Sequence, residues 1–275
     1  MQPHHTDQRE RVGRVLNPAQ PVPLLRYEYD RGSSYEIDTG IAIALSALVP
    51  EAELHHPDHR FFQLVHLITE YAWVGIHHEI CRVAAALEAG DAGLAGRLLN
   101  RCAGLADAPV RMVRLFEETL PQASMLAMRE KFPPKTTGLD SPGMRNLRRA
   151  SRAVWAAFQS AVDDAGTSLP QLTAIINRPA SRDTPDVAHL ALLSGVMSGL
   201  QRLDAKVLEW KQVHITTVWM LIGGHPAATD EADIPTSLRG RSVSYLERLA
   251  VVPLFPVLWR HTTAMFHAGL AEEAQ

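Results

Sequence analysis

Apolar residues recur at every third or fourth position over most of the chain, the spacing of one face of an α-helix. The pattern predicts two long helices, one over residues 59–87 and one over roughly 185–222. Shorter helices are expected over 35–49, 91–105, 109–120, 121–131, from after 145 to 164, and from 242 onward with a bend near Pro253 and Pro256. No alternation of apolar and polar residues exceeds four positions, so we predict an all-α fold.

Three stretches interrupt the helical pattern. Residues 1–31 lack periodicity and contain Pro18, Pro21 and Pro23, which predicts an extended arm that packs on, or swaps onto, a neighbouring subunit. Residues 132–145 and 223–240 are irregular, and such loops inside a helical domain often bind ligands. We therefore expect the arm 1–31, one helical domain over 32–275, and a homodimer or homotetramer.

The overall composition argues against several classes of binding partner. The chain of 275 residues is 46% hydrophobic and 21% charged, as in soluble globular proteins. A formal net charge of -3 gives no basic surface for nucleic acid or acidic lipid. No run of eighteen apolar residues and no apolar signal-peptide core occur, so we expect a cytoplasmic protein with no membrane partner. Cys81 and Cys102 fall in predicted helices and are expected to be reduced packing residues.

Two histidines fall on the inner faces of the long predicted helices. His214 shares a stripe with Trp210 and Leu221, and His66 lies one turn after Phe62. Two interpretations of His214 remain open: a core imidazole bonded to a backbone carbonyl, or a ligand to a metal or haem iron. The cluster 77–79 (His-His-Glu) lies roughly 18 Å further along the same helix. It cannot share a small metal centre with His66, and we assign it to a helix face or a subunit contact.

Several reaction classes lack their motifs. The chain has no HExxH, GxSxG, P-loop or GxGxxG, so metalloprotease, hydrolase and nucleotide-binding functions gain no support. A di-iron bundle would have Glu-x-x-His pairs on its long helices, and none of Glu70, Glu79, Glu117 and Glu118 has a histidine three residues later. The CxxCH motif for covalent haem attachment is also absent. His66, His214 and the loop residue Arg145 together would suit a non-covalent haem, with an arginine to hold a carboxylate. Without further information Arg145 could equally pair with an acid such as Asp140.

Four segments, in order, resemble the tryptophan 2,3-dioxygenase superfamily of haem-dependent aromatic oxygenases. The first, Phe61 to Glu70, is similar to the distal-histidine helix, with phenylalanine four residues before the histidine and glutamate four after. The second, Gly138 to Arg145, resembles the loop whose terminal arginine binds the substrate carboxylate. The remaining two are Trp210 to His214 followed by Gly223, similar to the haem-ligating helix, and Leu254-Phe255-Pro256, similar to a C-terminal element.

This resemblance implies a helical bundle of the tryptophan 2,3-dioxygenase type that encloses haem b. His214 is then the axial iron ligand, and His66 the acid–base catalyst that moves a proton of the oxidant. Arg145 is expected to hold the carboxylate of an aromatic amino acid. Further contacts implied for substrate are Ser141, Phe62, Tyr35 and Thr229, and for haem Trp210, Arg239 and Arg241. Phe62 and Trp210 would be ordinary core residues in most proteins.

The chain departs from the family after the axial histidine. The dioxygenases have a glycine-rich loop there, whereas this chain has Ala227-Ala228-Thr229-Asp230. The departure favours the L-tyrosine 3-hydroxylase branch, which converts L-tyrosine to 3-hydroxy-L-tyrosine with hydrogen peroxide in natural-product biosynthesis. Two alternatives stay open: a tryptophan (indole) dioxygenase or monooxygenase that uses O₂, and a haem-binding helical protein without catalysis.

Overall fold

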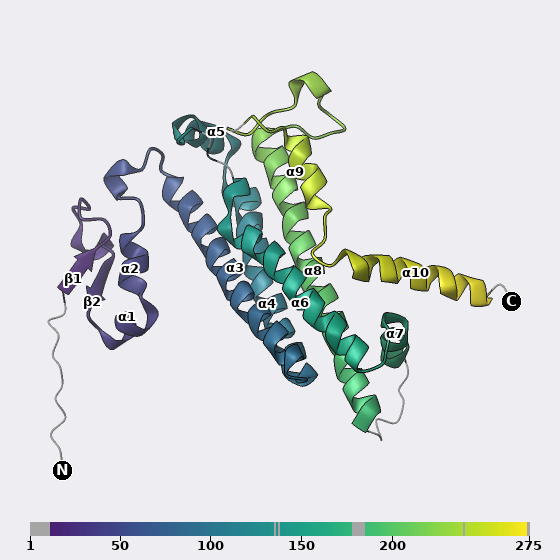
Figure 1. Cartoon of the computed structure of the whole chain (residues 1–275). Helices are drawn as coiled ribbons and strands as arrows, with labels where there is room; N and C mark the ends of the chain where they lie inside the picture. Colours follow the sequence, from purple (N-terminus) through teal and green to yellow (C-terminus); the bar gives the residue numbers. More distant parts are fainter. Residues whose placement is uncertain (1–11, 135, 137, 178–184, 239, 274–275) are drawn as a thin grey trace, which may run out of the picture. The chain divides into compact units, whose positions relative to one another are not determined.

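The computed structural model describes residues 12–134, 136, 138–177, 185–238 and 240–273. The chain divides into two compact units, Met1–Gln63 and Leu64–Gln275, which we describe separately. The described residues form ten α-helices and a single pair of short strands (Figure 1). The predicted all-α character is therefore confirmed.

The described part of the N-terminal unit starts with a β-hairpin, at positions where the sequence predicted an extended arm. Strands β1 (Val12–Val15) and β2 (Glu28–Arg31) pair antiparallel, with η1 (Pro23–Leu25) in the connection. Each strand has only four residues, too few for alternation to be visible in the sequence. The helix predicted over 35–49 is two helices, α1 (Ser34–Thr39) and α2 (Ile41–Ser46), because Gly40 adopts the left-handed conformation at φ 65°. Helix η2 (Glu51–Glu53) follows.

Two long helices come next in the chain. Helix α3 (His59–Glu88) begins in the N-terminal unit and continues into the second. Helix α4 (Ala92–Thr119) starts at Asp91, whose side chain accepts a hydrogen bond from the Leu94 amide. The predicted break at Pro109 was wrong, because Pro109 lies buried inside α4. Its ring fits helical φ and removes one amide donor without ending the helix.

The segment between α4 and α8 is more ordered than its sequence suggested. It contains α5 (Gln122–Lys131), η3 (Gly138–Asp140), α6 (Pro142–Asp164) and α7 (Leu169–Asn177). Ser141 caps α6 by accepting a hydrogen bond from the Met144 amide at 3.2 Å, and Pro142 occupies the first helical position. Arg145 therefore lies in the first turn of a helix and not in a loop.

Helix α8 (Pro185–Ile222) has the bounds expected from the sequence. After it come η4 (Glu231–Asp233), α9 (Val243–Ala250) and α10 (Pro256–Glu273). The single bent C-terminal helix that we predicted is thus two helices, separated at 251–255. Prolines at 253 and 256 explain the break, since neither can donate a backbone hydrogen bond.

The main core of the second unit lies between α3, α4, α6 and α8 (Figure 1). Each helix contributes a stripe of almost fully buried side chains, among them Trp73, Ile76, Leu99, Phe158, Leu193 and Leu200. None of the described helices has the length and apolar character needed to cross a membrane.

Candidate functional site

His214 lies in the last third of α8, one turn after Trp210. The two rings stack, with centroids 5.4 Å apart and planes inclined by 24°. Burial and, to a smaller extent, the charge of His66 together lower the pKa of His214 to about 4. Part of the His214 surface still reaches solvent, yet the surrounding protein is dense enough to disfavour the imidazolium. The imidazole is therefore neutral at pH 7, with a lone pair able to bind a metal ion.

The ring nitrogens of His214 have no hydrogen-bond partner among the residues that the structure describes. A core histidine would ordinarily be bonded to a carbonyl or carboxylate. The backbone bond expected under the structural interpretation is therefore missing from the described chain, as is a carboxylate that would tune an iron ligand.

His66 comes from α3 and belongs to the same part of the molecule. Its ring lies 5.7 Å from that of Phe116 on α4, and its charge acts on His214. His66 is exposed, in contrast to the inward position that the helical pattern predicted. The buried face of α3 is centred on Val65, Thr69 and Ile76, which places His66 at its edge.

Two tryptophans connect α3 to α8 beside these histidines. Trp73 is 1% exposed, and its ring meets the Trp210 ring edge-on at 5.3 Å and 85°. The indole nitrogen Nε1 of Trp210 is buried and has no hydrogen-bond partner among the described residues. An unpaired buried donor destabilises a protein by about 1–3 kcal/mol, so this nitrogen suits a bound group that carries an acceptor.

The start of α6 is held against α3 one helical turn after His66. The Gly143 amide donates a hydrogen bond to Glu70 Oε2 at 2.9 Å. A Cβ atom at residue 143 would lie 2.5 Å from Trp73 Cβ and 2.7 Å from Glu70 Oε2, so only glycine allows this approach. The Glu70 carboxylate also lies where the positive end of the α6 dipole favours an anion.

Arg145 follows two residues after this contact and is exposed. Its backbone amide bonds to the Ser141 carbonyl, and its guanidinium makes no hydrogen bond or ion pair with the described residues. The pairing with Asp140 that the sequence left open is thus not made. An unpaired guanidinium beside α3 is available to a carboxylate.

The other residues expected at the site are spread more widely. Tyr35, exposed on α1, and Phe62, on the first turns of α3, belong to the N-terminal unit. Thr229 is partly buried in the turn after α8. The Arg241 guanidinium lies 4.6 Å over the ring of Tyr245, which engages it in a cation–π contact. Arg239 lies outside the described residues.

Sequence reasoning missed two buried charges on α8. Asp204 is fully buried and accepts hydrogen bonds from the amides of Leu254 and Phe255, at 2.7 and 2.8 Å, and from the Trp259 indole at 3.0 Å. Lys211, 6% exposed, donates to the Val252 carbonyl. The sequence did contain a signal, because Asp204 is a charged residue among the apolar positions Leu203 and Val207 of the buried helix face. Together they hold residues 252–255 against α8.

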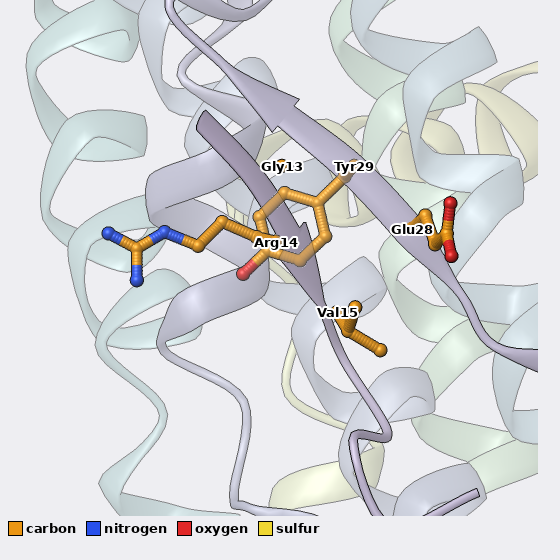
Figure 2. Close-up of a pocket in the computed structure, with 5 residues that line it drawn as sticks. All are labelled: Gly13, Arg14, Val15, Glu28 and Tyr29. Atoms are coloured by element: carbon orange, nitrogen blue, oxygen red, sulfur yellow. The ribbon is translucent and has the colours of Figure 1, made fainter. Parts of the chain in front are cut away.

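Neither of two cavities in the described part of the chain is lined by His66 or His214. One, of about 530 Å³, lies on the hairpin between Arg14 and Val15 of β1 and Glu28 and Tyr29 of β2 (Figure 2). Another, of about 260 Å³, lies where α3 ends and α4 begins, and is bordered by Asp164 and His189.

No group of three or more His, Cys, Asp or Glu side chains in the described part of the chain could hold a metal ion. A bare metal would need such a group. A single histidine ligand fits a metal that brings its own equatorial ligands, as the iron of haem does. The unpaired Trp210 indole and the neutral His214 imidazole also fit this kind of group.

No protein-family model matches the sequence, and no curated protein matches it. The residues of the site are therefore the basis for assigning a function.

Proposed function

We propose that the protein is a haem b-dependent oxygenase that hydroxylates a free aromatic amino acid, L-tyrosine to 3-hydroxy-L-tyrosine, with hydrogen peroxide. The observation that carries the proposal is the His214 imidazole, which is neutral, free of hydrogen bonds to described residues, and within range of the charge of His66. A histidine with these properties has the form that binds iron.

His214 would hold the iron of haem, and Trp210 would pack beside this ligand with its N–H directed to an acceptor of the cofactor. Haem would supply the one- and two-electron chemistry that activates the oxidant. The protein would contribute the His214 nitrogen as the iron ligand, and Trp73 and Phe116 would provide apolar surroundings.

His66 and Arg145 supply the remaining functions from the chain itself. A ring nitrogen of His66 accepts a proton from the oxidant and returns it to the departing oxygen, a role for which imidazole is well suited near neutral pH. Arg145 binds the amino-acid carboxylate, and the Gly143–Glu70 contact fixes the helix turn that carries it. The exposed position of both residues lets substrate enter from solvent.

Absorption spectroscopy tests the cofactor. The purified protein, supplied with haem, should have a Soret band that His214→Ala removes. His78→Ala is the matched control, because His78 is an exposed histidine on α3, and its Soret band should be unchanged. A wild-type protein that binds no haem would refute the proposal.

Product analysis tests the reaction. L-Tyrosine with hydrogen peroxide should give 3-hydroxy-L-tyrosine. Arg145→Ala should lower kcat/KM by an amount equivalent to about 2–5 kcal/mol of lost transition-state stabilisation. Arg149→Ala, an exposed arginine one turn later on α6, should retain activity. Consumption of tryptophan with O₂, and no catechol from tyrosine, would instead identify an indole oxygenase. A Soret band with no turnover of either amino acid would indicate a haem-binding protein without catalysis.

A further inference from the structure

One buried hydroxyl of α3 lacks the partner that comparable residues have. Thr69 is 8% exposed, and its Oγ1 atom is buried with no hydrogen-bond partner among the described residues. Threonines inside helices usually donate to the carbonyl four residues earlier. Every other threonine in the described helices does so, namely Thr39, Thr119, Thr173, Thr216, Thr217, Thr262 and Thr263. The Thr69 hydroxyl is therefore turned away from its own helix.

The neighbours of Thr69 on α3 define what it faces. His66 lies one turn before it, and Trp73 lies one turn after it. His66 acts on His214 of α8, and Trp73 contacts Trp210 of α8. Thr69 thus lies on α3 between two residues that are both directed to α8, on the buried face. The spacing of residues 66, 69 and 73 puts Thr69 on the side of α3 that faces α8.

The proposed carboxylate anchor lies beside this hydroxyl. Glu70, the residue after Thr69, accepts the hydrogen bond of Gly143, and Arg145 follows two residues later. Arg145 is exposed whereas Thr69 is buried. An amino acid held by Arg145 at the surface would extend its side chain inward toward Thr69.

We propose that Thr69 binds the phenolic oxygen of the substrate and selects a hydroxylated ring. This inference rests on the proposed function. A threonine hydroxyl both donates and accepts, and so does a phenol, so the two groups satisfy each other. A phenyl ring would leave Thr69 Oγ1 buried and unpaired, and sites built in this way reject analogues that lack the hydroxyl. Thr69 is then a specificity-determining residue on the same helix as His66, one turn further along α3.

Calorimetric titration of the haem-loaded protein with L-tyrosine and L-phenylalanine tests this role without turnover. The wild type should bind L-tyrosine more tightly. Thr69→Val should reduce that preference roughly three- to tenfold, the value of one hydrogen bond, and Thr69→Ser should restore it. Thr217→Val is the matched control. Thr217 is 5% exposed and its hydroxyl already bonds to the Val213 carbonyl at 2.8 Å, so the preference should not change.

The outcomes separate this inference from the proposed function. A Thr69→Val protein that keeps the full preference, with a normal Soret band, overturns the role of Thr69 alone. Equal loss of affinity for both amino acids also overturns it, because Thr69 would then shape the site without reading the phenol. A wild-type protein that binds neither amino acid overturns the role of Thr69 together with the proposed reaction.

Discussion

Single residues determine how closely the elements around His214 can approach. Gly143 allows α6 to begin against Trp73 and Glu70, and Thr69 and Trp210 each present an unpaired polar atom to the same region. The sequence predicted from helical periodicity that His66 and His214 point inward, and the structure has His214 half-buried but His66 exposed. The sequence could not predict the Gly143 contact or the unpaired Thr69, because both depend on which helix packs opposite.

Gly143→Ala tests the close approach of α6 to α3. The added methyl group would overlap Trp73 Cβ, so we expect a loss of about 1–3 kcal/mol in the free energy of unfolding. Because the first turn of α6 must shift, the affinity for the proposed amino-acid substrate should fall as well. Urea denaturation and ligand titration measure the two effects.

Gly96→Ala is the control for that substitution. Gly96 lies inside α4, and no described atom comes within 4 Å of the position that an added methyl group would take. Alanine should therefore stabilise this helix by up to about 1 kcal/mol. Equal stability of Gly143→Ala and wild type would contradict the close packing.

Asp204 is the residue on which the joint between α9 and α10 depends. Asp204→Asn would place amide hydrogens opposite some of its three donors, and we expect a loss of about 2–4 kcal/mol in the free energy of unfolding. Asp163→Asn, an exposed aspartate at the end of α6, should change stability by less than about 0.5 kcal/mol. Thermal or chemical denaturation compares the pair, and similar stabilities would argue against a role for Asp204.

At the scale of elements, the sequence predicted α3 and α8 closely and the shorter helices less well. The long helices repeat their apolar stripe over many turns, so their bounds are clear. Pro109 suggested an end of helix, yet its buried position within α4 shows that packing outweighed the missing hydrogen bond. Pro253 and Pro256 explain why α9 and α10 are separate helices. The contacts of Asp204 and Lys211 that hold residues 252–255 against α8 are long-range and leave little trace in local sequence.

The titration of Lys211 should make the free energy of unfolding depend on pH. Burial and the charge of Arg148 lower its pKa from 10.5 to about 8, although Asp204 acts in the opposite direction. Between these two pH values the unfolded chain binds more protons than the folded protein, so the free energy of unfolding should rise as the pH rises from 8 toward 10.5. The full contribution is up to about 3 kcal/mol.

Lys211→Met removes the titrating group and should remove this alkaline increase. Chemical denaturation at about pH 7.5, 9 and 11, which spans the lowered and the ordinary lysine pKa, measures the slope for both proteins. Lys206→Met serves as a control, because Asp107 and Glu209 raise the pKa of Lys206 and this lysine should contribute no increase in that range. An unchanged slope in Lys211→Met would show that another group titrates.

At the scale of the whole molecule, the division of the chain was the feature least accessible from sequence. The arm over residues 1–31 and the helical domain over 32–275 stay a prediction from where periodicity begins. The chain divides into compact units between Gln63 and Leu64, inside α3. Periodicity reports where helices form, and it does so for α1 and α2 as for the rest. Which helices pack together depends on contacts between residues far apart in the sequence. A uniform helical pattern therefore does not predict where one compact unit ends and the next begins.

Asp204 and Lys211 form hydrogen bonds with residues 252, 254 and 255, so the connection between α9 and α10 must keep its length. One residue added between Ala250 and Pro256 would move the amides of Leu254 and Phe255 out of register with one carboxylate, and we expect such a chain to be poorly expressed or cleaved by protease. The same addition among the exposed residues 226–228 should be tolerated. Tags, reporters and permuted ends would therefore be better placed in the turn after α8 than between α9 and α10.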